Sequence, residues 1–358
     1  MVLRPSDPKP KWRVLGKTNN PAHVEVIDLD GDGIKDILVA DLGNFIPTDD
    51  PCGRVVWLRG NKDRTFTPHV LLENVGRVAD VQAADFRKTG KLDLVVAEFG
   101  LYKFGSILFL ENQTTDWSKP KFVPKVIDGR HGAIHVPCRD ARGKLVDLNG
   151  DGRIDFVALI SQEHEAVVAF LNEGNGKFTK KTIYTAPHPA YGSSGIQLVD
   201  MNGDGKLDVL YTNGDSLDPP ALLKPYHAVQ WLENPGDGKY PWKHHLIGPM
   251  YGAMRAVAAD VNGDGLVDVV AVSFLPKEWV AERKARDRDL DAIVLFEQTS
   301  PGKFVRHPLL MEECDHTSCA LGDVMGSGRL DLVVGNFGFN VETPVTVWKN
   351  LGKPKPRK

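Results

Sequence analysis

One segment of this chain occurs six times, and this repetition limits the possible folds more than any other feature of the sequence. Each copy combines an apolar strand, a polar Gly-rich turn and a second apolar strand rich in Val and Leu, as in VIDLDGDGIKDILVADLG. Successive copies start 53 to 63 residues apart, the range that a four-stranded blade with its loops requires. The first aspartates of the six copies are Asp28, Asp85, Asp147, Asp200, Asp260 and Asp323.

Further strands complete each repeat. A third apolar run follows every copy, as in VVWLRG, and an alternating fourth run follows five copies, as in FTPHVLL. The sixth copy has no fourth run, while the chain begins with a similar unpaired segment, KWRVLGKT, at residues 11–18. Because exposed strand edges promote aggregation, we expect this N-terminal strand to complete the last blade and close the ring.

The sequence therefore predicts an all-β fold, a six-bladed β-propeller of four-stranded antiparallel blades that forms a single domain over residues 1–358. A basic tail occupies residues 352–358, and the segment from Lys277 to Arg286 has some helical periodicity. The blade repeats are centred on residues 28–36, 85–93, 147–155, 200–208, 260–268 and 323–331.

Four of the turns are acidic loops. The first, DLDGDGIKD, places side-chain oxygens at loop positions one, three, five and nine and leaves a backbone carbonyl at position seven. Three later loops keep this spacing with Asn at position three, and glycines at positions four and six let the alternate side chains converge. The predicted metal ligands are Asp28, Asp30, Asp32, Ile34 and Asp36; Asp147, Asn149, Asp151, Arg153 and Asp155; Asp200, Asn202, Asp204, Lys206 and Asp208; and Asp260, Asn262, Asp264, Leu266 and Asp268.

Oxygen ligands in this arrangement suit calcium, which accepts six to eight oxygens in irregular geometry, better than magnesium, which demands an octahedron. The competing interpretation is that Asp, Asn and Gly simply favour turns, but clustered carboxylates repel one another without a cation. We therefore expect four calcium sites, one in each acidic loop. The second loop has Arg87 at position three and the sixth has Met325 there with Ser327 at position five, so both are expected to be metal-free, and Arg87 is expected to supply the positive charge of its loop internally.

These loops, with the Phe-Gly pairs at Phe99 and Phe337, resemble the FG-GAP or VCBS repeats of integrin α-subunit propellers and of bacterial extracytoplasmic proteins. The resemblance covers nearly the whole chain. It implies structural calcium ions in the acidic loops and an extracytoplasmic location, either periplasmic or secreted. It implies little about activity, because one fold serves many functions.

The face opposite the acidic loops is the expected ligand site. Connections that leave second strands and enter first strands share that face, and seven of the eleven histidines fall in them. We expect a His-rich polar funnel, although for each residue alone a hydrogen-bonded loop tether is the competing interpretation. The other four histidines, His69, His244, His245 and His307, are expected to be solvated on fourth strands. The candidate catalytic residues are His23, His135, His164, His227, Arg255 and His316.

Two functions of different classes stay open. The first is a binding module for a carbohydrate or a protein, in which calcium stiffens the blades. The second is a carbohydrate lyase or dehydratase, because PAHVEVIDLDGDG, GAIHV and GAMRAV distantly resemble the propeller of fungal aldos-2-ulose dehydratase. That resemblance implies histidines acting as general bases or as ligands of an additional transition metal. No nucleophile elbow, P-loop or HExxH segment supports other chemistry.

Composition limits the classes of binding partner that we expect for this chain. Lys and Arg total 44 against 47 Asp and Glu, a net charge of -3 that gives no reason to expect nucleic acid. No apolar run approaches the ~18 residues of a membrane span, and the first residues lack the apolar core of a signal peptide. Of the four cysteines, Cys314 and Cys319 either form a small loop disulfide or stay reduced.

Overall fold

The structure is a computed structural model of the chain and describes residues 3–5, 13–101, 105–129, 132–161, 165–217, 223–275, 290–337 and 343–352. The described residues form strands, turns and loops, with no helix among them. The chain divides into two compact units, which we treat separately: the N-terminal unit, Trp12–Pro189, and the C-terminal unit, Ala190–Lys358 with Met1–Lys11.

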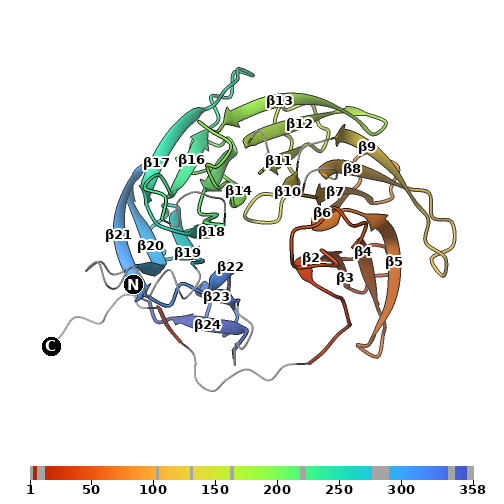
Figure 1. Cartoon of the computed structure of the whole chain (residues 1–358), viewed down its shortest axis with the longest axis horizontal. Helices are drawn as coiled ribbons and strands as arrows, with labels where there is room; N and C mark the ends of the chain where they lie inside the picture. The colour runs from red at the N-terminus through yellow and green to blue at the C-terminus, as the bar shows by residue number, and fades with distance from the viewer. Residues whose placement is uncertain are drawn as a thin grey trace. The chain divides into compact units, whose positions relative to one another are not determined.

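The N-terminal unit contains blades one to three, each a four-stranded antiparallel meander (Figure 1). Blade one consists of β2 (Pro21–Ile27), β3 (Asp36–Asp41), β4 (Gly53–Gly60) and β5 (Phe66–Val75). Blade two consists of β6 (Arg77–Ala84), β7 (Asp93–Phe99), β8 (Gly105–Asn112) and β9 (Phe122–Gly129). Blade three consists of β10 (Ala133–His135), β11 (Phe156–Ile160), β12 (Ala166–Gly174) and β13 (Lys177–Thr185).

The C-terminal unit contains blades four to six. Blade four consists of β14 (Gly195–Val199), β15 (Asp208–Thr212), β16 (Ala228–Glu233) and β17 (Lys243–Pro249). Blade five consists of β18 (Ala253–Ala259), β19 (Asp268–Ser273), β20 (Asp291–Ser300) and β21 (Lys303–Met311). Blade six consists of β22 (His316–Gly322), β23 (Asp331–Asn336), β24 (Val345–Asn350) and β1 (Leu3–Pro5). The predicted six-bladed, all-β propeller fold is confirmed.

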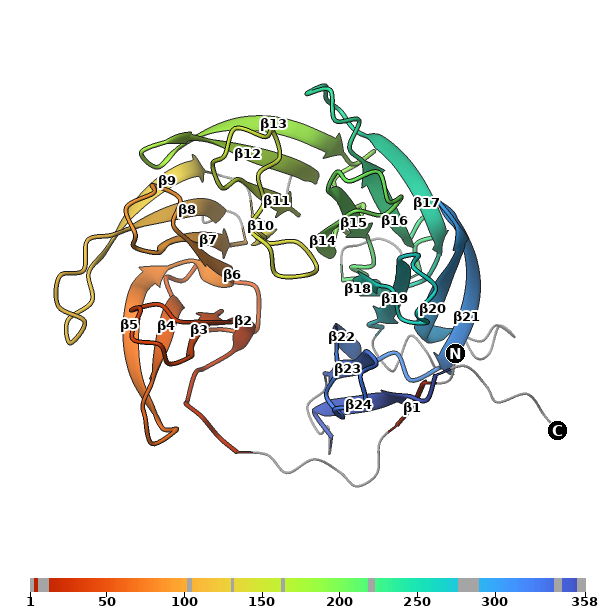
Figure 2. The ribbon, with the colours of Figure 1, turned by 180° about the vertical axis from the view of Figure 1, so that it is seen from behind.

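The fourth strand of blade six comes from the N-terminal end of the chain, but not from the predicted segment. β1 pairs antiparallel with β24, with Leu3 opposite Asn350 (Figure 2). Residues 13–18 of the segment at 11–18 have no regular structure, and Val14 is 82% exposed. The prediction of that segment was wrong because an open edge is satisfied by backbone N–H and C=O groups, which any extended segment supplies. Ring closure by this strand stays a prediction.

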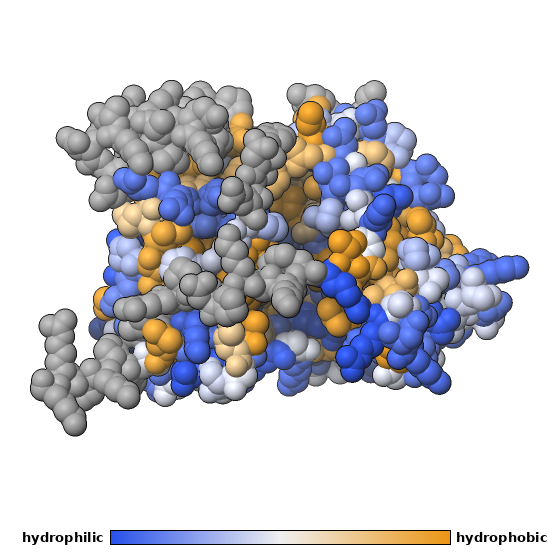
Figure 3. Space-filling view, turned by 90° about the horizontal axis from the view of Figure 1, so that it is seen from below, coloured by the Kyte–Doolittle hydropathy of each residue, from blue (hydrophilic) through white to orange (hydrophobic). Residues whose placement is uncertain are grey.

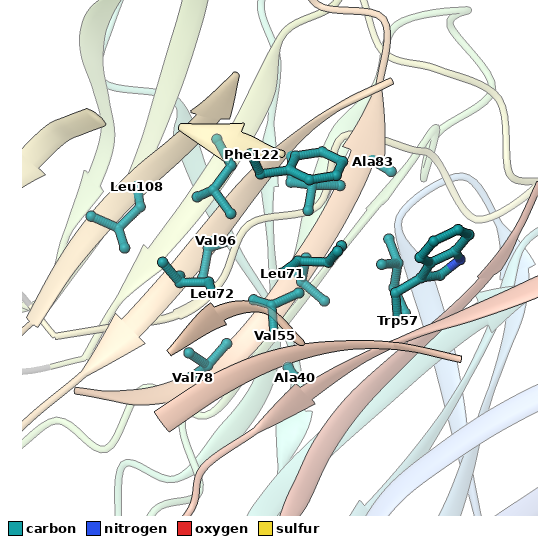
Figure 4. Close-up of a cluster of buried hydrophobic side chains, with 14 of the residues drawn as sticks. Ala40, Val55, Trp57, Leu71, Leu72, Val78, Ala83, Val96, Leu108 and Phe122 are labelled. Carbon is teal, nitrogen blue, oxygen red and sulfur yellow. The ribbon is translucent and has the colours of Figure 1, made fainter. Parts of the chain in front are cut away.

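Apolar side chains fill the space between neighbouring blades within each unit. Between blades one and two, the fully buried Trp57 belongs to one apolar cluster with Leu71, Val78 and Val96 (Figure 4). Equivalent clusters lie between blades two and three and on both sides of blade five. The second and third strands supply most of these side chains, which is why they read as continuous apolar runs.

Side-chain amides connect neighbouring blades more specifically than this packing does. Asn172 Nδ2 of blade three donates to the Phe86 carbonyl of blade two at 2.8 Å. In the C-terminal unit, Asn350 of blade six donates to the Val261 carbonyl of blade five at 3.0 Å. Each amide also donates to a carbonyl of its own blade, so losing it leaves two buried acceptors unsatisfied.

The fourth strands of blades one to five are irregular at equivalent points. The pairing of third and fourth strands shifts register at one equivalent place in all five, with further shifts in blades one, three and five. Pro68, Pro124 and Pro308 interrupt three of these fourth strands. Bulges and prolines discourage edge-to-edge association. Exposed apolar side chains such as Leu246, 60% exposed, therefore do not make these strands free pairing edges. Hydrophilic and hydrophobic residues are interspersed on the face that Figure 3 shows.

Other predictions have mixed outcomes. All four cysteines are free, so Cys314 and Cys319 are not paired in this structure. Lys277 to Arg286 lie outside the described residues. Within the part of the chain that the structure covers, there is no helix long and apolar enough to cross a membrane.

Deletion of residues 2–10 removes β1 and uncovers the edge of β24, so we expect the variant to aggregate and to unfold more readily. The lost ladder hydrogen bonds correspond to roughly 1–3 kcal/mol. Size-exclusion chromatography and thermal melting would measure both effects, with removal of residues 353–358 as the control. Equal behaviour of the variant and the full chain would show that β1 is dispensable.

Candidate functional site

The loops between first and second strands share one backbone frame. In the acidic loop of blade one, the Asp28 carboxylate accepts the N–H groups of Asp32 at 3.1 Å and Gly33 at 2.9 Å. The first aspartates of the other loops accept the equivalent two N–H groups, including those of blades two and six. Gly31 and Gly33 have φ of 73° and 85°, and Lys88 of blade two adopts φ 54° at position four. The frame therefore does not require the acidic residues at positions three and five.

The aspartate at position nine ties each loop to the third strand. The fully buried Asp208 accepts Met201 N–H at 2.9 Å and Asn234 N–H at 2.8 Å. Burial raises the pKa of Asp208 to about 7, although these hydrogen bonds oppose the shift. Burial likewise raises the pKa of Asp155 and of Asp268 to about 6. Neighbouring loop aspartates contribute to all three shifts, as expected for carboxylates packed together without a cation.

The remaining predicted ligands lie close to these two anchors. In blade one, oxygens of Asp28, Asp30 and Asp36 lie within 4.8 Å of one another. At position seven, the N–H groups of the four predicted residues donate to the position-five aspartates, each at 2.9 Å. These position-seven residues are Ile34, Arg153, Lys206 and Leu266.

The loop of blade two supplies its own cation. Arg87 at position three makes two hydrogen bonds to Asp93, at 3.0 and 2.9 Å, and lies 2.9 Å from Glu111. The predicted internal neutralisation is thereby confirmed. Burial still raises the pKa of Asp93, even though Arg87 stabilises its charged form.

A second candidate site lies where the first strands begin. β2, β6, β10 and β18 each shift register near their start, directly before a polar residue. Such bulges re-aim side chains and occur next to binding sites. The residues placed in this way are His23, Asp80, His135 and Arg255.

In the N-terminal unit, the structure brings three of these residues together. Asp80 is buried, with Oδ1 2.7 Å from His23 Nδ1 and Oδ2 3.8 Å from His135 Nδ1. Val136 N–H donates to Asp80 Oδ2 at 2.8 Å. Burial alone would raise the pKa of Asp80, but His23 and His135 hold it well below the usual value. The imidazoles stay 31% and 21% exposed, so a ligand can reach them.

A second ion pair lies near this group. Glu25 of β2 accepts Ala83 N–H of β6 at 2.7 Å and lies 3.0 Å from Arg139 Nε. Arg139 also donates to the Ala83 carbonyl, so three blades meet at one backbone unit. The sequence analysis missed Glu25. The available sequence signal was that Glu25 is the only carboxylate of a largely apolar strand.

In the C-terminal unit, the candidate catalytic residues contact neighbouring loops and strands of their own unit. His227 is buried and accepts Gly252 N–H at Nδ1, and burial lowers its pKa to about 4. His316 Nδ1 lies 2.9 Å from Asn336 Oδ1 and 3.1 Å from the Asp315 carboxylate. The Arg255 side chain passes over Gly195, where an added Cβ would lie 3.2 Å from Arg255 Cδ. The loop-tether interpretation therefore holds for both histidines.

The remaining predicted histidines and one buried lysine differ from the sequence-based expectations or lie outside the described residues. His164 lies outside the described residues. His245 and His307 on fourth strands are not simply solvated, because their Nε2 atoms lie 2.6 Å from Glu233 and 2.8 Å from Glu297. Sequence reasoning also missed Lys224, whose buried ammonium donates to two backbone carbonyls; no sequence signal marks it.

The repeated blades and their loops define a repeat protein of the β-propeller class. The FG-GAP-like repeat family matches residues 28–96, 147–211 and 213–271, together more than half of the chain. The chain belongs to the FG-GAP-like repeat family.

Named relatives are distant. The T-cell immunomodulatory protein homolog of Plasmodium falciparum (isolate 3D7) is 24% identical over 234 residues, covering 58% of this chain and 31% of the relative. Cartilage acidic protein 1 of Mus musculus is 22% identical over 357 residues, covering 95% of this chain and 52% of the relative. The chain thus spans about a third to half of the relatives' length. The solved structure of the V. cholerae biofilm matrix protein Bap1 aligns with a TM-score of 0.42 and 14% identity over 81% of this chain and 39% of that chain, too low for an argument.

We expect Asp80→Asn to reduce the free energy of unfolding by about 2–3 kcal/mol near pH 5, because it removes a hydrogen-bonded buried charge. A carboxylate with a depressed folded pKa stabilises above its unfolded pKa and loses that contribution as pH falls toward the folded value. The difference between wild type and variant should therefore shrink by about 1 kcal/mol between pH 5 and pH 3. Urea unfolding at each pH measures it. The exposed Glu73→Gln is the control, and a pH-independent difference would contradict the assignment.

Proposed function

We propose that this chain is a calcium-stabilised, ligand-binding propeller. In this proposal the acidic loops of blades one, three, four and five hold calcium, and polar side chains at the starts of first strands bind a carbohydrate or protein ligand. The observation that carries the ligand proposal is the group His23–Asp80–His135, which combines one buried charge with two accessible imidazoles. Family membership supports the propeller fold, whereas the support for ligand binding comes from the group His23–Asp80–His135.

The residues of the acidic loops fit calcium. Their side-chain donors are all oxygen, three of those in blade one lie within 4.8 Å, and burial and mutual repulsion raise the pKa of three position-nine aspartates. The predicted residues at positions one, three, five, seven and nine would hold the ion, and calcium when bound would neutralise their charges. In blade one, Arg59 lies 2.6 Å from Asp30 and competes with a cation there.

An extracytoplasmic location follows from the same proposal. Extracellular calcium modules typically bind with dissociation constants of about 10⁻⁴–10⁻³ M, which cytosolic calcium does not reach. Loops with three or four carboxylates and exposed ends belong in such an environment.

We expect excess EGTA to lower the melting temperature, because each occupied site adds about 2.7 kcal/mol when free calcium is 100 times its dissociation constant. Differential scanning calorimetry with and without calcium measures the shift. Asp260→Ala should lower the bound calcium from four ions to three by mass spectrometry, since one of the four acidic loops loses its first ligand.

Asp85→Ala is the matched control for this experiment. Asp85 accepts the same two loop N–H groups as Asp260, at 2.8 Å each, but its loop contains Arg87. The control should keep the wild-type calcium content despite losing similar hydrogen bonds. An unchanged melting curve in EGTA would refute structural calcium.

A carbohydrate lyase or dehydratase is the second candidate. The observation that favours it is the 2.7 Å contact between His23 Nδ1 and the buried Asp80, the arrangement in which a carboxylate orients an imidazole as a general base. Such a base would remove the proton next to a sugar carbonyl or carboxylate during β-elimination. A binding module needs no such proton transfer.

We expect His135→Ala to weaken ligand binding about tenfold, equivalent to one lost polar contact of about 1.4 kcal/mol. The measurement is a screen of glycans, uronic acids and keto-sugars by binding and by ultraviolet absorbance of a newly formed double bond. His69→Ala is the control, because His69 belongs to the same unit but lies on the fourth strand β5, outside the expected ligand face. Absorbance would select the lyase, whereas unchanged binding of every wild-type ligand would place the ligand site elsewhere.

A further inference from the structure

In blades one, two, four and five, one residue of the third strand contacts position three of the loop in its own blade, and we call the residue at the equivalent place in every blade the facing residue. This facing residue directly precedes the residue whose N–H binds the position-nine aspartate. Its chemistry differs from blade to blade. The facing residues of blades one to six are Arg59, Glu111, Leu171, Glu233, Glu297 and Lys349.

In the first two blades, the charges of facing residue and loop residue are complementary. In blade one, Arg59 lies 2.6 Å from Asp30 at loop position three. In blade two the signs are reversed, with Glu111 2.9 Å from Arg87. In these two blades, the facing residue therefore has a charge opposite to that of the residue at position three.

Blades four and five have Asn at position three and Glu as the facing residue. Asn202 Nδ2 donates to Glu233 Oε1 at 3.4 Å, and Asn262 Nδ2 donates to Glu297 Oε1 at 3.1 Å. A carboxylate accepts hydrogen bonds only, so it stabilises the amide orientation with nitrogen outward. Each amide oxygen then faces the loop, where it accepts the position-five N–H at 3.0 and 2.9 Å.

Histidines of the fourth strands hold these two glutamates from the other side. His245 Nε2 lies 2.6 Å from Glu233 Oε2, and His307 Nε2 lies 2.8 Å from Glu297 Oε2. His245 is itself stacked on Trp231, with ring centroids 4.3 Å apart. One carboxylate oxygen is thus anchored to the blade and the other is directed to the loop.

Blade three provides the natural contrast. Its loop has Asn149 at position three, but its facing residue is Leu171, which cannot accept a hydrogen bond. Asn149 Nδ2 donates inside the loop to Asp151 Oδ2 at 2.8 Å, a bond that Asn262 of blade five also makes, to Asp264 Oδ2 at 3.0 Å, beside its bond to Glu297. The Asn149 oxygen accepts Asp151 N–H at 3.2 Å, so blade three has the same amide orientation but no acceptor at its facing residue to hold it.

We propose that Glu233 and Glu297 are positioning residues for calcium, each fixing the position-three amide with its oxygen toward the ion. This inference rests on the calcium binding proposed above. Partners outside the ligand set orient metal ligands, and their loss typically weakens metal affinity 10- to 100-fold. Blades four and five should therefore bind calcium more tightly than blade three.

The test exchanges the facing residues of blades five and three. Glu297→Leu gives blade five the residue of blade three, and should weaken one calcium dissociation constant about tenfold in competition with a chromophoric chelator. Glu297→Gln keeps an oxygen acceptor and should retain most of the affinity. Leu171→Glu should strengthen the site of blade three several-fold.

Melting without calcium separates positioning from a structural role. Glu297→Leu breaks a partly exposed pair with His307 and the surface hydrogen bond from Asn262, so its calcium-free melting temperature should stay near wild type while its calcium-induced rise shrinks. An equal loss with and without calcium, with unchanged dissociation constants, would overturn the inference. If wild type binds no calcium, the proposed function fails; if it binds calcium but both exchanges leave every constant unchanged, only this inference fails.

Discussion

A buried carboxylate at the end of each loop is the interaction on which the blades depend. Asp36, Asp93, Asp155, Asp208, Asp268 and Asp331 have no exposed surface. Each joins the start of the second strand to the N–H of a third-strand residue, and five of them also bind a loop N–H. Charge-assisted hydrogen bonds offset the cost of burying such a group. These hydrogen bonds therefore fix the register of the hairpin and the third strand without requiring a metal ion.

The loop residues that maintain the fold are therefore different from the residues that distinguish the acidic loops from the other two. Position one accepts the same two loop N–H groups in all six blades, although blades two and six lack the Asp or Asn at position three and the Asp at position five. Position nine keeps its tether to the third strand in both, but Asp93 binds Arg87 in place of a loop N–H. Positions three and five are free to vary because they do not build the loop. The amides of Asn172 and Asn350 then use the same corner of the blade to reach the preceding one. In blades three and six, one end of the blade thus contains both the tether of the loop and the connection to a neighbour.

The sequence was sufficient for the features that repetition enforces. Strand order, the six loops and the internal neutralisation by Arg87 followed from aligning the copies, because each constraint appears several times. β1 could not be predicted in the same way, since a short extended segment has no side-chain pattern of its own. The grouping of His23 and His135 around Asp80 depended on strand bulges, which the sequence does not display. Glu233 and Glu297 were missed although their position beside the tether residue recurs in every copy.

The arginine in the loop of blade two has a consequence for how the N-terminal unit is assembled. Blade two packs against both of its neighbours through continuous apolar clusters, and it brings its own positive charge to Asp93. The loop of blade two therefore needs no divalent ion to offset the Asp93 charge. Under the calcium binding proposed for blades one and three, falling ion concentrations would loosen the unit from its two flanks while its centre stays intact.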